Sequence, residues 1–316
     1  MRIVSLLPSA TEMVCAIGMG DLLCGVSHEC DFPQPVKSLP RVTRCLIPVG
    51  ATSGEIDAFV RQQAETQSSL YALDTDLLLE LRPDLILTQS LCGVCAIADD
   101  DVRAVAEKLP SKPLVLNLQP NSLSSVFESM VKIGEVTERA NDANSAVSRL
   151  RQRVDAVRMR STRLFDQTPK QERLKVMVLE WIDPPFTAGH WTPELVSIAG
   201  GEEVLGVGGQ RSQTTNWQSI CEADPELMLI ACCGLSVDRT CKDLPLAAPL
   251  PDLYEMRCVR NRRVYAVDGN AFFSRPGPRL VDSLEILAHA IDPATHSLSS
   301  ELNPYAAVAV DLVGNR

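Results

Sequence analysis

The chain has few aromatic residues and lacks the short motifs that mark several common enzyme classes. Aromatic side chains make up 4% of its 316 residues. It contains no Gly-x-Ser-x-Gly nucleophile motif and no Gly-x-x-x-x-Gly-Lys phosphate loop, which argues against a serine hydrolase and a P-loop nucleotide hydrolase. No dense run of lysine and arginine occurs and the net charge is -10, so a nucleic-acid-binding face is not expected.

Long apolar stretches are also absent. No segment approaches the roughly 18 continuous apolar residues of a membrane span, so stable membrane insertion is not expected. Met1-Arg2 leads directly into Ile3-Val4-Ser5-Leu6-Leu7-Pro8, which is too short for the apolar core of a signal peptide. These absences predict a cytoplasmic protein, in which the 11 cysteines are reduced thiols.

What the sequence does contain is a plan that occurs twice. In the first half, an apolar strand at 2–7 is followed by a Pro-Ser turn, a short helix, a glycine pair and a second strand at 23–26. In the second half, a strand at 174–179 is followed by a proline pair, a helix, a glycine pair and a strand at 204–207. A plan that recurs in this way predicts two similar structural units.

The repeat continues further along each half. Leu81-Arg82-Pro83-Asp84 and Ala223-Asp224-Pro225-Glu226 each end a helix at proline, directly before an apolar strand. Strands that alternate with helices at this spacing predict parallel βαβ units. We therefore expect an α/β protein with two doubly wound, Rossmann-like lobes and one long or once-broken helix that joins them. The predicted boundaries are 1–121 for the N-terminal lobe, 122–167 for the helix, 168–291 for the C-terminal lobe and 292–316 for a weakly patterned tail.

Thiols and an imidazole follow two strands of the first half. His28 and Cys30 come after one strand, and Cys92 and Cys95 come after another. If these strands are neighbours, their carboxyl ends meet at one edge of the sheet. The four side chains would then suit a zinc site, an iron–sulfur centre or a redox pair. Two alternatives stay open, namely that the same residues line a site for an organic ligand, or that the cysteines are inert.

Several characteristic segments occur in a fixed order along the chain. They are Ser5-Leu6-Leu7-Pro8-Ser9-Ala10-Thr11-Glu12, Cys30-Asp31-Phe32-Pro33, Leu81-Arg82-Pro83-Asp84-Leu85-Ile86, Pro184-Pro185-Phe186-Thr187-Ala188-Gly189, Gly200-Gly201-Glu202 and Arg275-Pro276-Gly277-Pro278-Arg279. Together they resemble the cobalamin-binding proteins of ABC importers. The resemblance implies two α/β lobes linked by a rigid helix, with a ligand clamped between the lobes by the loops at the strand ends. The expected ligand is cobalamin, another corrinoid or a related metal chelate.

A macrocyclic ligand has wide apolar faces and polar edges, so its site needs aromatic walls and a few polar groups. By position in the motifs, the resemblance implies ligand contacts from Glu29, Gln89, Trp181, Phe272, Phe273 and Arg275. The other polar or aromatic residues expected at the site are Ser9, His28, Glu180, His190, Trp191 and Trp217. Core packing is the alternative for Trp181 and Phe273.

The sequence defines the expected site better than it defines what the protein does with its ligand. Glu180 and His190 could exchange a proton, but without a catalytic motif we expect a binding protein rather than an enzyme. Importer proteins present an acidic residue on each lobe to their permease. Asp76 fits this role in the first lobe, whereas Gln218 occupies the matching place in the second. Uptake through an ABC permease, storage, and delivery to a partner protein therefore stay open, as does the oligomeric state.

Overall fold

The computed structural model describes residues 1–48, 50–65, 70–89, 99–167, 173–246, 251–305 and 307–312. The chain forms two compact units. The first unit contains Met1–Pro120 and Ser124–Ser148, and the second contains Asn121–Leu123 and Arg149–Arg316.

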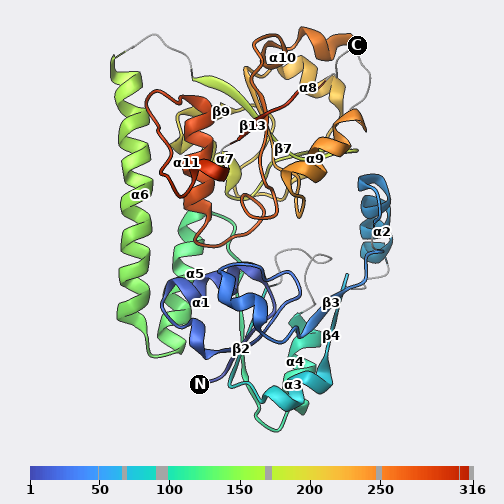
Figure 1. Ribbon diagram of the computed structural model, residues 1–316, viewed down its shortest axis with the longest axis vertical. Helices are drawn as coiled ribbons and strands as arrows, with labels where there is room; N and C mark the ends of the chain where they lie inside the picture. Colours follow the sequence, from blue (N-terminus) through green and yellow to red (C-terminus); the bar gives the residue numbers. More distant parts are fainter. Residues whose placement is uncertain are drawn as a thin grey trace. The chain divides into compact units, whose positions relative to one another are not determined.

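Four parallel strands form the main sheet of the first unit, in the order β2-β1-β5-β6. The edge strand β2 is labelled in Figure 1. The four strands are β1 (Ile3–Ser5), β2 (Leu23–Val26), β5 (Leu85–Thr88) and β6 (Leu114–Asn117). The central strands β1 and β5 are buried along their whole length, as expected for a parallel sheet covered on both faces. Their neighbours are α1 (Pro8–Ala16), η1 (Gly20–Leu22), η2 (Gln34–Ser38), α3 (Thr75–Leu81), α4 (Asp99–Lys108) and α5 (Leu123–Val136).

A second, two-stranded sheet belongs to the same unit. Strand β3 (Thr43–Cys45) pairs antiparallel with β4 (Tyr71–Leu73), and α2 (Ser53–Glu65) lies between them in the sequence. Leu78 of α3 and Val102 of α4 pack against Val4 and Ile86 of the main sheet. Because these apolar side chains come from distant parts of the chain, their burial stabilises the whole unit.

The second unit is built on a larger mixed sheet. The strand order is β10-β8-β7-β11-β12-β13, and β9 pairs with the first part of β7. The strands are β7 (Leu174–Ile182), β8 (Pro185–Thr187), β9 (Gly201–Glu203), β10 (Gln213–Thr214), β11 (Leu227–Ile230), β12 (Val264–Ala266) and β13 (Val308–Ala309). Strands β7, β11 and β12 are parallel and supply the buried centre of the sheet. Short antiparallel strands complete both edges.

Helices surround this second sheet. They are α7 (Thr192–Ile198), α8 (Trp217–Ala223), α9 (Val237–Asp243), η3 (Leu244–Leu246), η4 (Pro251–Glu255), α10 (Arg257–Arg260), α11 (Leu280–Ile291) and η5 (Asn303–Tyr305). The end of the chain, expected to be a weakly patterned tail, supplies both η5 and the edge strand β13.

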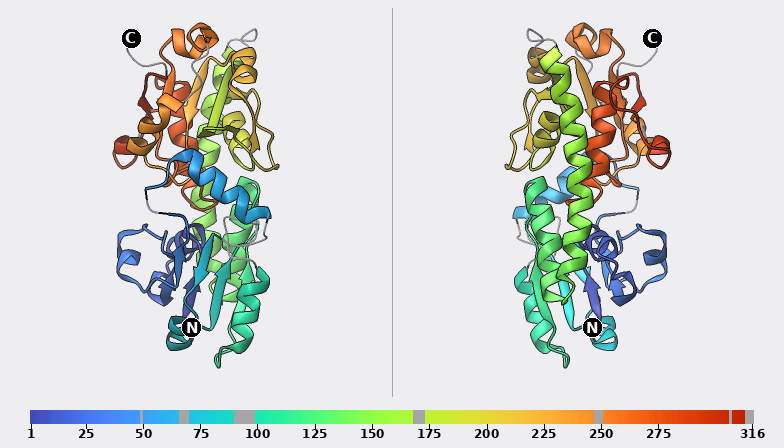
Figure 2. Two further views of the ribbon diagram at one scale, coloured as in Figure 1. Left: turned by 90° about the vertical axis from the view of Figure 1, so that its right-hand side faces the viewer. Right: turned by 90° about the vertical axis from the view of Figure 1, so that its left-hand side faces the viewer.

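The helical segment expected at 122–167 is divided in two. Helix α5 ends at Val136, and α6 runs over Ala140–Gln167 (Figure 2). Glu138, in the connection, has a positive φ of 59°. The α5–α6 corner is tight at Gly134, where an added Cβ would lie 2.4 Å from the Cβ of Ala143. Further along α6, Arg153 pairs with Asp282 and Glu285 of α11.

The predicted α/β architecture is confirmed, and the repeated motif has a common geometry. Arg82 and Asp224 cap the ends of α3 and α8 in the left-handed conformation, with φ of 44° and 45°. In each unit the proline that follows prevents the helix from continuing, and a buried strand begins two residues after it.

Candidate ligand-binding site

The carboxyl ends of the parallel strands in the first unit bring together several predicted residues. Ser9 follows β1 in the first turn of α1, His28 and Glu29 follow β2, and Gln89 follows β5. Ser9 is buried, His28 and Gln89 are half-buried, and Glu29 is exposed. Because β1 pairs directly with both β2 and β5, these positions share one edge of the sheet.

The hydroxyl group of Thr43 orients the imidazole of His28. The Nδ1 atom of His28 lies 2.7 Å from Thr43 Oγ1, and the backbone N–H of His28 donates to the same oxygen at 3.0 Å. The Thr43 hydroxyl in turn donates to Ser27 Oγ at 3.2 Å. With Thr43 donating to Ser27, His28 Nδ1 is the donor to Thr43 Oγ1. The Nε2 atom then presents a lone pair, and it is buried without a partner in the described part of the chain.

Burial also keeps this imidazole neutral. Desolvation lowers the pKa of His28, and the charge of Arg41 acts in the same direction, while the charge of Glu29 opposes both. A neutral imidazole with an open Nε2 lone pair is a good metal ligand and hydrogen-bond acceptor.

Tyr71 completes this cluster, and sequence reasoning did not find it. Its hydroxyl donates to Glu29 Oε1 at 3.0 Å, and its ring centroid lies 4.9 Å from that of His28. Tyr71 opens β4, whose pairing with β3 depends on residues far apart in the sequence. The local sequence Leu70-Tyr71-Ala72-Leu73 gives no sign of that pairing. We call His28, Glu29 and Tyr71 the strand-end cluster.

The predicted metal site is not assembled by the described residues. Cys30 is buried and its Sγ lies 3.1 Å from Thr11 Oγ1, while His28 bonds to Thr43. Cys92 and Cys95 lie outside the described residues. Among those that are described, no three histidine, cysteine or acidic side chains lie together in a way that could hold a metal ion.

Most of the aromatic residues predicted for the second half are buried. Trp191, Trp217, Phe272 and Phe273 are each at most 5% exposed. The indole N–H of Trp191 donates to the carbonyl oxygen of Phe273 at 2.6 Å, which links α7 to the loop before α11. Trp217 belongs to the apolar cluster around β7 and β11. Ligand contact by these four residues stays a prediction.

Trp181 and His190 retain exposed surface. Trp181 lies at the carboxyl end of β7, packs against the apolar cluster with part of its ring, and donates its indole N–H to the carbonyl oxygen of Asp183 at 3.1 Å. His190 stacks on Trp191 with a centroid distance of 5.3 Å. Burial lowers the pKa of His190, and the nearby charge of Arg211 lowers it further.

Glu180 and Arg275 have partners of their own within the unit. Glu180 accepts hydrogen bonds from the Ser212 hydroxyl and the Gly189 N–H. Arg275 is only 7% exposed and donates to Asn270 Oδ1 at 3.0 Å. Burial raises the pKa of Glu180 to about 7. A second carboxyl that sequence reasoning missed, Glu203, lies in the same region and also has a pKa raised to about 7 by burial.

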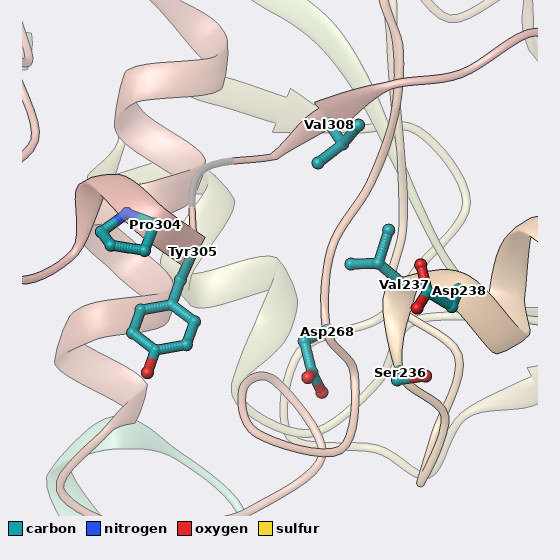
Figure 3. A pocket seen from close by; sticks show the side chains of 7 residues that line it. All are labelled: Ser236, Val237, Asp238, Asp268, Pro304, Tyr305 and Val308. Atoms are coloured by element: carbon teal, nitrogen blue, oxygen red, sulfur yellow. The ribbon is translucent and has the colours of Figure 1, made fainter.

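A small pocket lies elsewhere in the second unit (Figure 3). Its volume is about 220 Å³. The lining residues are Ser236, Val237, Asp238, Asp268, Pro304, Tyr305 and Val308. None of the predicted ligand contacts lines it, and its walls include the C-terminal segment for which the sequence showed no pattern.

The chain is similar in sequence to known bacterial binding proteins. An uncharacterised ABC transporter substrate-binding lipoprotein of Bacillus subtilis is 24% identical over 93% of this chain and 81% of its own length. A vitamin B12-binding protein of Yersinia pestis is 23% identical over 75% of this chain and 72% of its own.

Solved structures share the fold over nearly the full length. A periplasmic haem-binding protein of Pseudomonas aeruginosa aligns with a TM-score of 0.72 and 20% identity, covering 98% of both chains. A periplasmic vitamin B12-binding protein of Vibrio cholerae aligns with a TM-score of 0.65 and 20% identity, covering 93% of this chain and 97% of its own. At this level of identity the likeness establishes the fold alone.

These relatives overturn the predicted cytoplasmic location. They are named as lipoprotein or periplasmic proteins, which work outside the cytoplasm. The prediction was wrong because it was drawn from the first residues, and these form β1 at the centre of the first sheet, so they carry no information about location. In the described residues no helix has the length and apolar character needed to cross a bilayer.

A match to a protein-family model covers most of the chain. The family model described as "Periplasmic binding protein" matches residues 3–271, from β1 to the loop before α11, and so includes the central strands of both units. The chain therefore belongs to the periplasmic binding protein family.

Proposed function

We propose that this chain is the substrate-binding component of an ABC importer, and that its ligand is a metal-chelating macrocycle, with a corrinoid as the first candidate. Relatives named as a vitamin B12-binding protein and as an ABC transporter substrate-binding lipoprotein support this assignment. Storage and intracellular delivery, the other two roles that the sequence left open, are not proposed, because both require a cytoplasmic location.

The strand-end cluster carries the proposal. A neutral imidazole whose buried Nε2 has no hydrogen-bond partner among the described residues can donate to the axial position of a chelated cobalt or iron ion, once the ligand displaces the groups that cover this atom. Glu29 and the Tyr71 hydroxyl lie beside it and can bond to the polar edge of a macrocycle. The loops at the strand ends of an α/β sheet are also where this class of fold places ligand contacts.

Apolar surface accompanies these polar groups. Phe32, three residues after Glu29, is 46% exposed, and Leu46, next to the β3 residue that pairs with Tyr71, is 42% exposed. Exposed large apolar side chains close to a polar cluster suit a ligand with flat apolar faces. In the second unit, Trp181 is the half-buried aromatic residue that we assign to ligand contact.

Titration with cobalamin and, separately, with haem tests the proposal. We expect saturable quenching of tryptophan fluorescence and a shift in the absorption spectrum of the chelate. His28→Ala should abolish the spectral shift, because the axial nitrogen is gone. Trp181→Ala should weaken binding by about tenfold, which corresponds to roughly 1.4 kcal/mol. Tyr254→Phe, an exposed tyrosine in η4, is the matched control and should bind normally.

Each outcome separates one part of the proposal from another. Binding of haem but not cobalamin would keep the metal-chelate class and exclude the corrinoid. Normal binding by His28→Ala would exclude the strand-end cluster. Failure to bind either chelate, together with stoichiometric zinc or iron in the purified protein, would refute the proposal and favour the cysteine cluster.

A further inference from the structure

We propose that Thr43 and Arg41 are positioning residues for the strand-end cluster. They fix His28 as a hydrogen-bond acceptor, so that the site selects a ligand by its metal ion rather than by a carboxylate at its edge. The selection rests on the proposed function. The positioning does not, because every contact that carries it lies within the chain itself.

The chain directly before β3 lies alongside the end of β2. Val26 N–H donates to the carbonyl oxygen of Pro40 at 2.9 Å, and Val42 N–H donates to that of Val26 at 3.0 Å. Val42 is buried in the apolar cluster of the first unit. Because side chains alternate along extended backbone, those of Arg41 and Thr43 leave on the opposite side from Val42. Both can therefore act on the loop that follows β2.

The guanidinium of Arg41 holds this loop at three carbonyl oxygens. Its Nη1 donates to Ser27 at 3.1 Å and to Cys30 at 2.8 Å, and its Nη2 donates to Lys37 at 3.2 Å. The loop is thus fastened where it begins and where it returns. A planar guanidinium offers several donors in fixed directions, which the single ammonium group of lysine does not.

Thr43 fixes the side chain that the loop carries. Its Oγ1 accepts the backbone N–H of His28 at 3.0 Å and lies 2.7 Å from Nδ1 of the same residue. It donates to Ser27 Oγ at 3.2 Å, and this oxygen also accepts the N–H of Glu29 at 3.3 Å. Thr43 is 4% exposed and Ser27 is 2% exposed, so these bonds are shielded from water. Two hydroxyl groups therefore order both polar residues at the end of β2.

The direction of this hydroxyl chain decides what His28 offers a ligand. Because Thr43 donates to Ser27, Nδ1 of His28 is the donor to Thr43, and Nε2 carries a lone pair. The reversed chain would place the hydrogen on Nε2. That atom is buried and has no partner among the described residues. Buried N–H groups without an acceptor are rarer in proteins than acceptors with a spare lone pair, which favours the first direction.

A fixed lone pair restricts the chemistry of the ligand. It attracts a metal ion or a hydrogen-bond donor and repels a carboxylate. Since Thr43 holds the ring and Arg41 holds the loop, His28 cannot adapt by exchanging its tautomer or by turning away. Once the groups that cover Nε2 are displaced, the chelate must therefore present a metal ion whose axial position can exchange. A chelate with both axial positions blocked would lose this contact.

Ring-nitrogen NMR of the protein without any ligand tests the role of Thr43. We expect His28 to show a protonated Nδ1 and an unprotonated Nε2. Thr43→Ser keeps the hydroxyl and should keep this signature, whereas Thr43→Val removes the acceptor and should mix the two tautomers. A role in packing alone would leave the signature unchanged in Thr43→Val. That result, or a protonated Nε2 in the unaltered protein, would exclude the positioning by Thr43.

Hydrogen exchange without any ligand tests the role of Arg41. The amide of Cys30 donates to the carbonyl oxygen of Ser27 at 3.1 Å, inside the part of the loop that Arg41 holds. Arg41→Lys should lower the protection of this amide by about tenfold, because more than one hydrogen bond is lost. Arg44→Lys, at an exposed position of β3, is the matched control and should exchange like the unaltered protein. Equal protection in Arg41→Lys would exclude the clamp.

Paired probes test the selection. Haem and metal-free protoporphyrin share their carboxylates and apolar faces and differ in the metal. Diaquacobinamide and dicyanocobinamide share the corrin ring, but cyanide blocks both axial positions of the second. Within whichever pair binds, the first member should bind about tenfold more tightly, and Thr43→Val, but not Thr43→Ser, should remove most of this preference.

The outcomes separate the selection from the proposed function. An equal or reversed preference within each pair would overturn the selection, while the chain would still be a binding protein for macrocycles. Failure of all four probes to bind would refute the proposed function and the selection with it. The NMR and exchange results would decide the positioning in either case, because both are measured without a ligand.

Discussion

Single side chains in this protein take their roles from partners that are distant in the sequence. The strand-end positions of His28 and Glu29 could be predicted, because polar residues directly after an apolar strand are visible in the sequence. The tautomer of His28 depends on Thr43, and the position of Glu29 depends on Tyr71. Neither partner lies within ten residues, so no local pattern could have revealed them.

Arg153 is the residue whose loss should be most evident in stability. It donates to Asp282 at 2.6 Å and to Glu285 at 2.9 Å. Burial lowers the pKa of Arg153, but its hydrogen bonds to the two carboxylates outweigh burial and raise that pKa. For Asp282 burial is the larger effect, so its pKa is raised even though it pairs with Arg153. Arg153→Ala would leave two partly buried carboxylates unpaired. We expect the free energy of unfolding to fall by about 1–2 kcal/mol. This is less than for a fully buried pair, because Arg153 is partly exposed.

Chemical denaturation of Arg153→Ala would measure this loss. Arg158→Ala provides the matched control on the same helix, because its pair with Asp155 is exposed on both sides. That control should change stability by less than about 0.5 kcal/mol. Equal effects from the two variants would show that the pairing with α11 contributes nothing beyond a surface ion pair.

At the scale of helices and strands, the predictable elements were those with a strong local pattern. The central strands are uninterrupted apolar runs bounded by proline or glycine, and they appear where the repeat indicates. The short strands β3, β4, β10 and β13 were not predicted, because each is only two or three residues long and exists through pairing with a distant partner. The C-terminal segment shows no pattern in the sequence for the same reason.

The close contact between Gly134 and Ala143 at the α5–α6 corner leads to a prediction about helix packing. In Gly134→Ala, the better helix propensity of alanine would gain about 1 kcal/mol. The new methyl group would, however, lie 2.4 Å from the Cβ of Ala143 and 3.0 Å from the carbonyl oxygen of Arg139, and neither atom can move by rotating a side chain. Overpacking of this kind costs about 1–3 kcal/mol, so we expect a net loss of stability by thermal unfolding.

The double variant Gly134→Ala/Ala143→Gly checks the mechanism. It moves one methyl group across the same contact, so the clash disappears and the helix propensities of the two positions exchange. Its stability should return close to that of the unaltered protein. If the double variant were less stable than Gly134→Ala alone, steric contact would not be the cause.

At the scale of the whole molecule, two sets of buried groups have opposite effects on how stability changes with pH. Burial lowers the pKa values of His28, His190 and His296 below 6.5, so their neutral forms support the fold above that value and this support is lost on acidification. Glu180 and Glu203 act in the opposite sense over the same pH range.

Replacing one of these histidines should therefore change how stability depends on pH. His296→Gln keeps a partner for Ser161, whose hydroxyl lies 3.2 Å from His296 Nε2, but cannot be protonated. We expect the variant to lose less stability than the unaltered protein between pH 7.5 and pH 5, by up to about 1.4 kcal/mol for each unit by which the pKa is lowered. Parallel curves for the two proteins would exclude His296 as a contributor.

The fold class could be predicted at this scale, whereas the location could not. The repeat of strands, helices and proline-terminated motifs is a property of the folded chain, and it predicted the α/β architecture that the structure shows. Location is not a property of the fold, and the residues that form β1 pack at the centre of the sheet. A prediction drawn from those residues was therefore misleading.

Helix α6 also constrains which changes in chain length the protein can accept. Arg153 meets Asp282 and Glu285, and Ser161 meets His296 eight residues later, and all of these residues belong to the second unit. One residue inserted between Arg153 and Ser161 would turn one contact about 100° away from the other around the helix axis. Relatives should therefore vary in length in their loops, while the spacing between these two helix positions behaves as a fixed count.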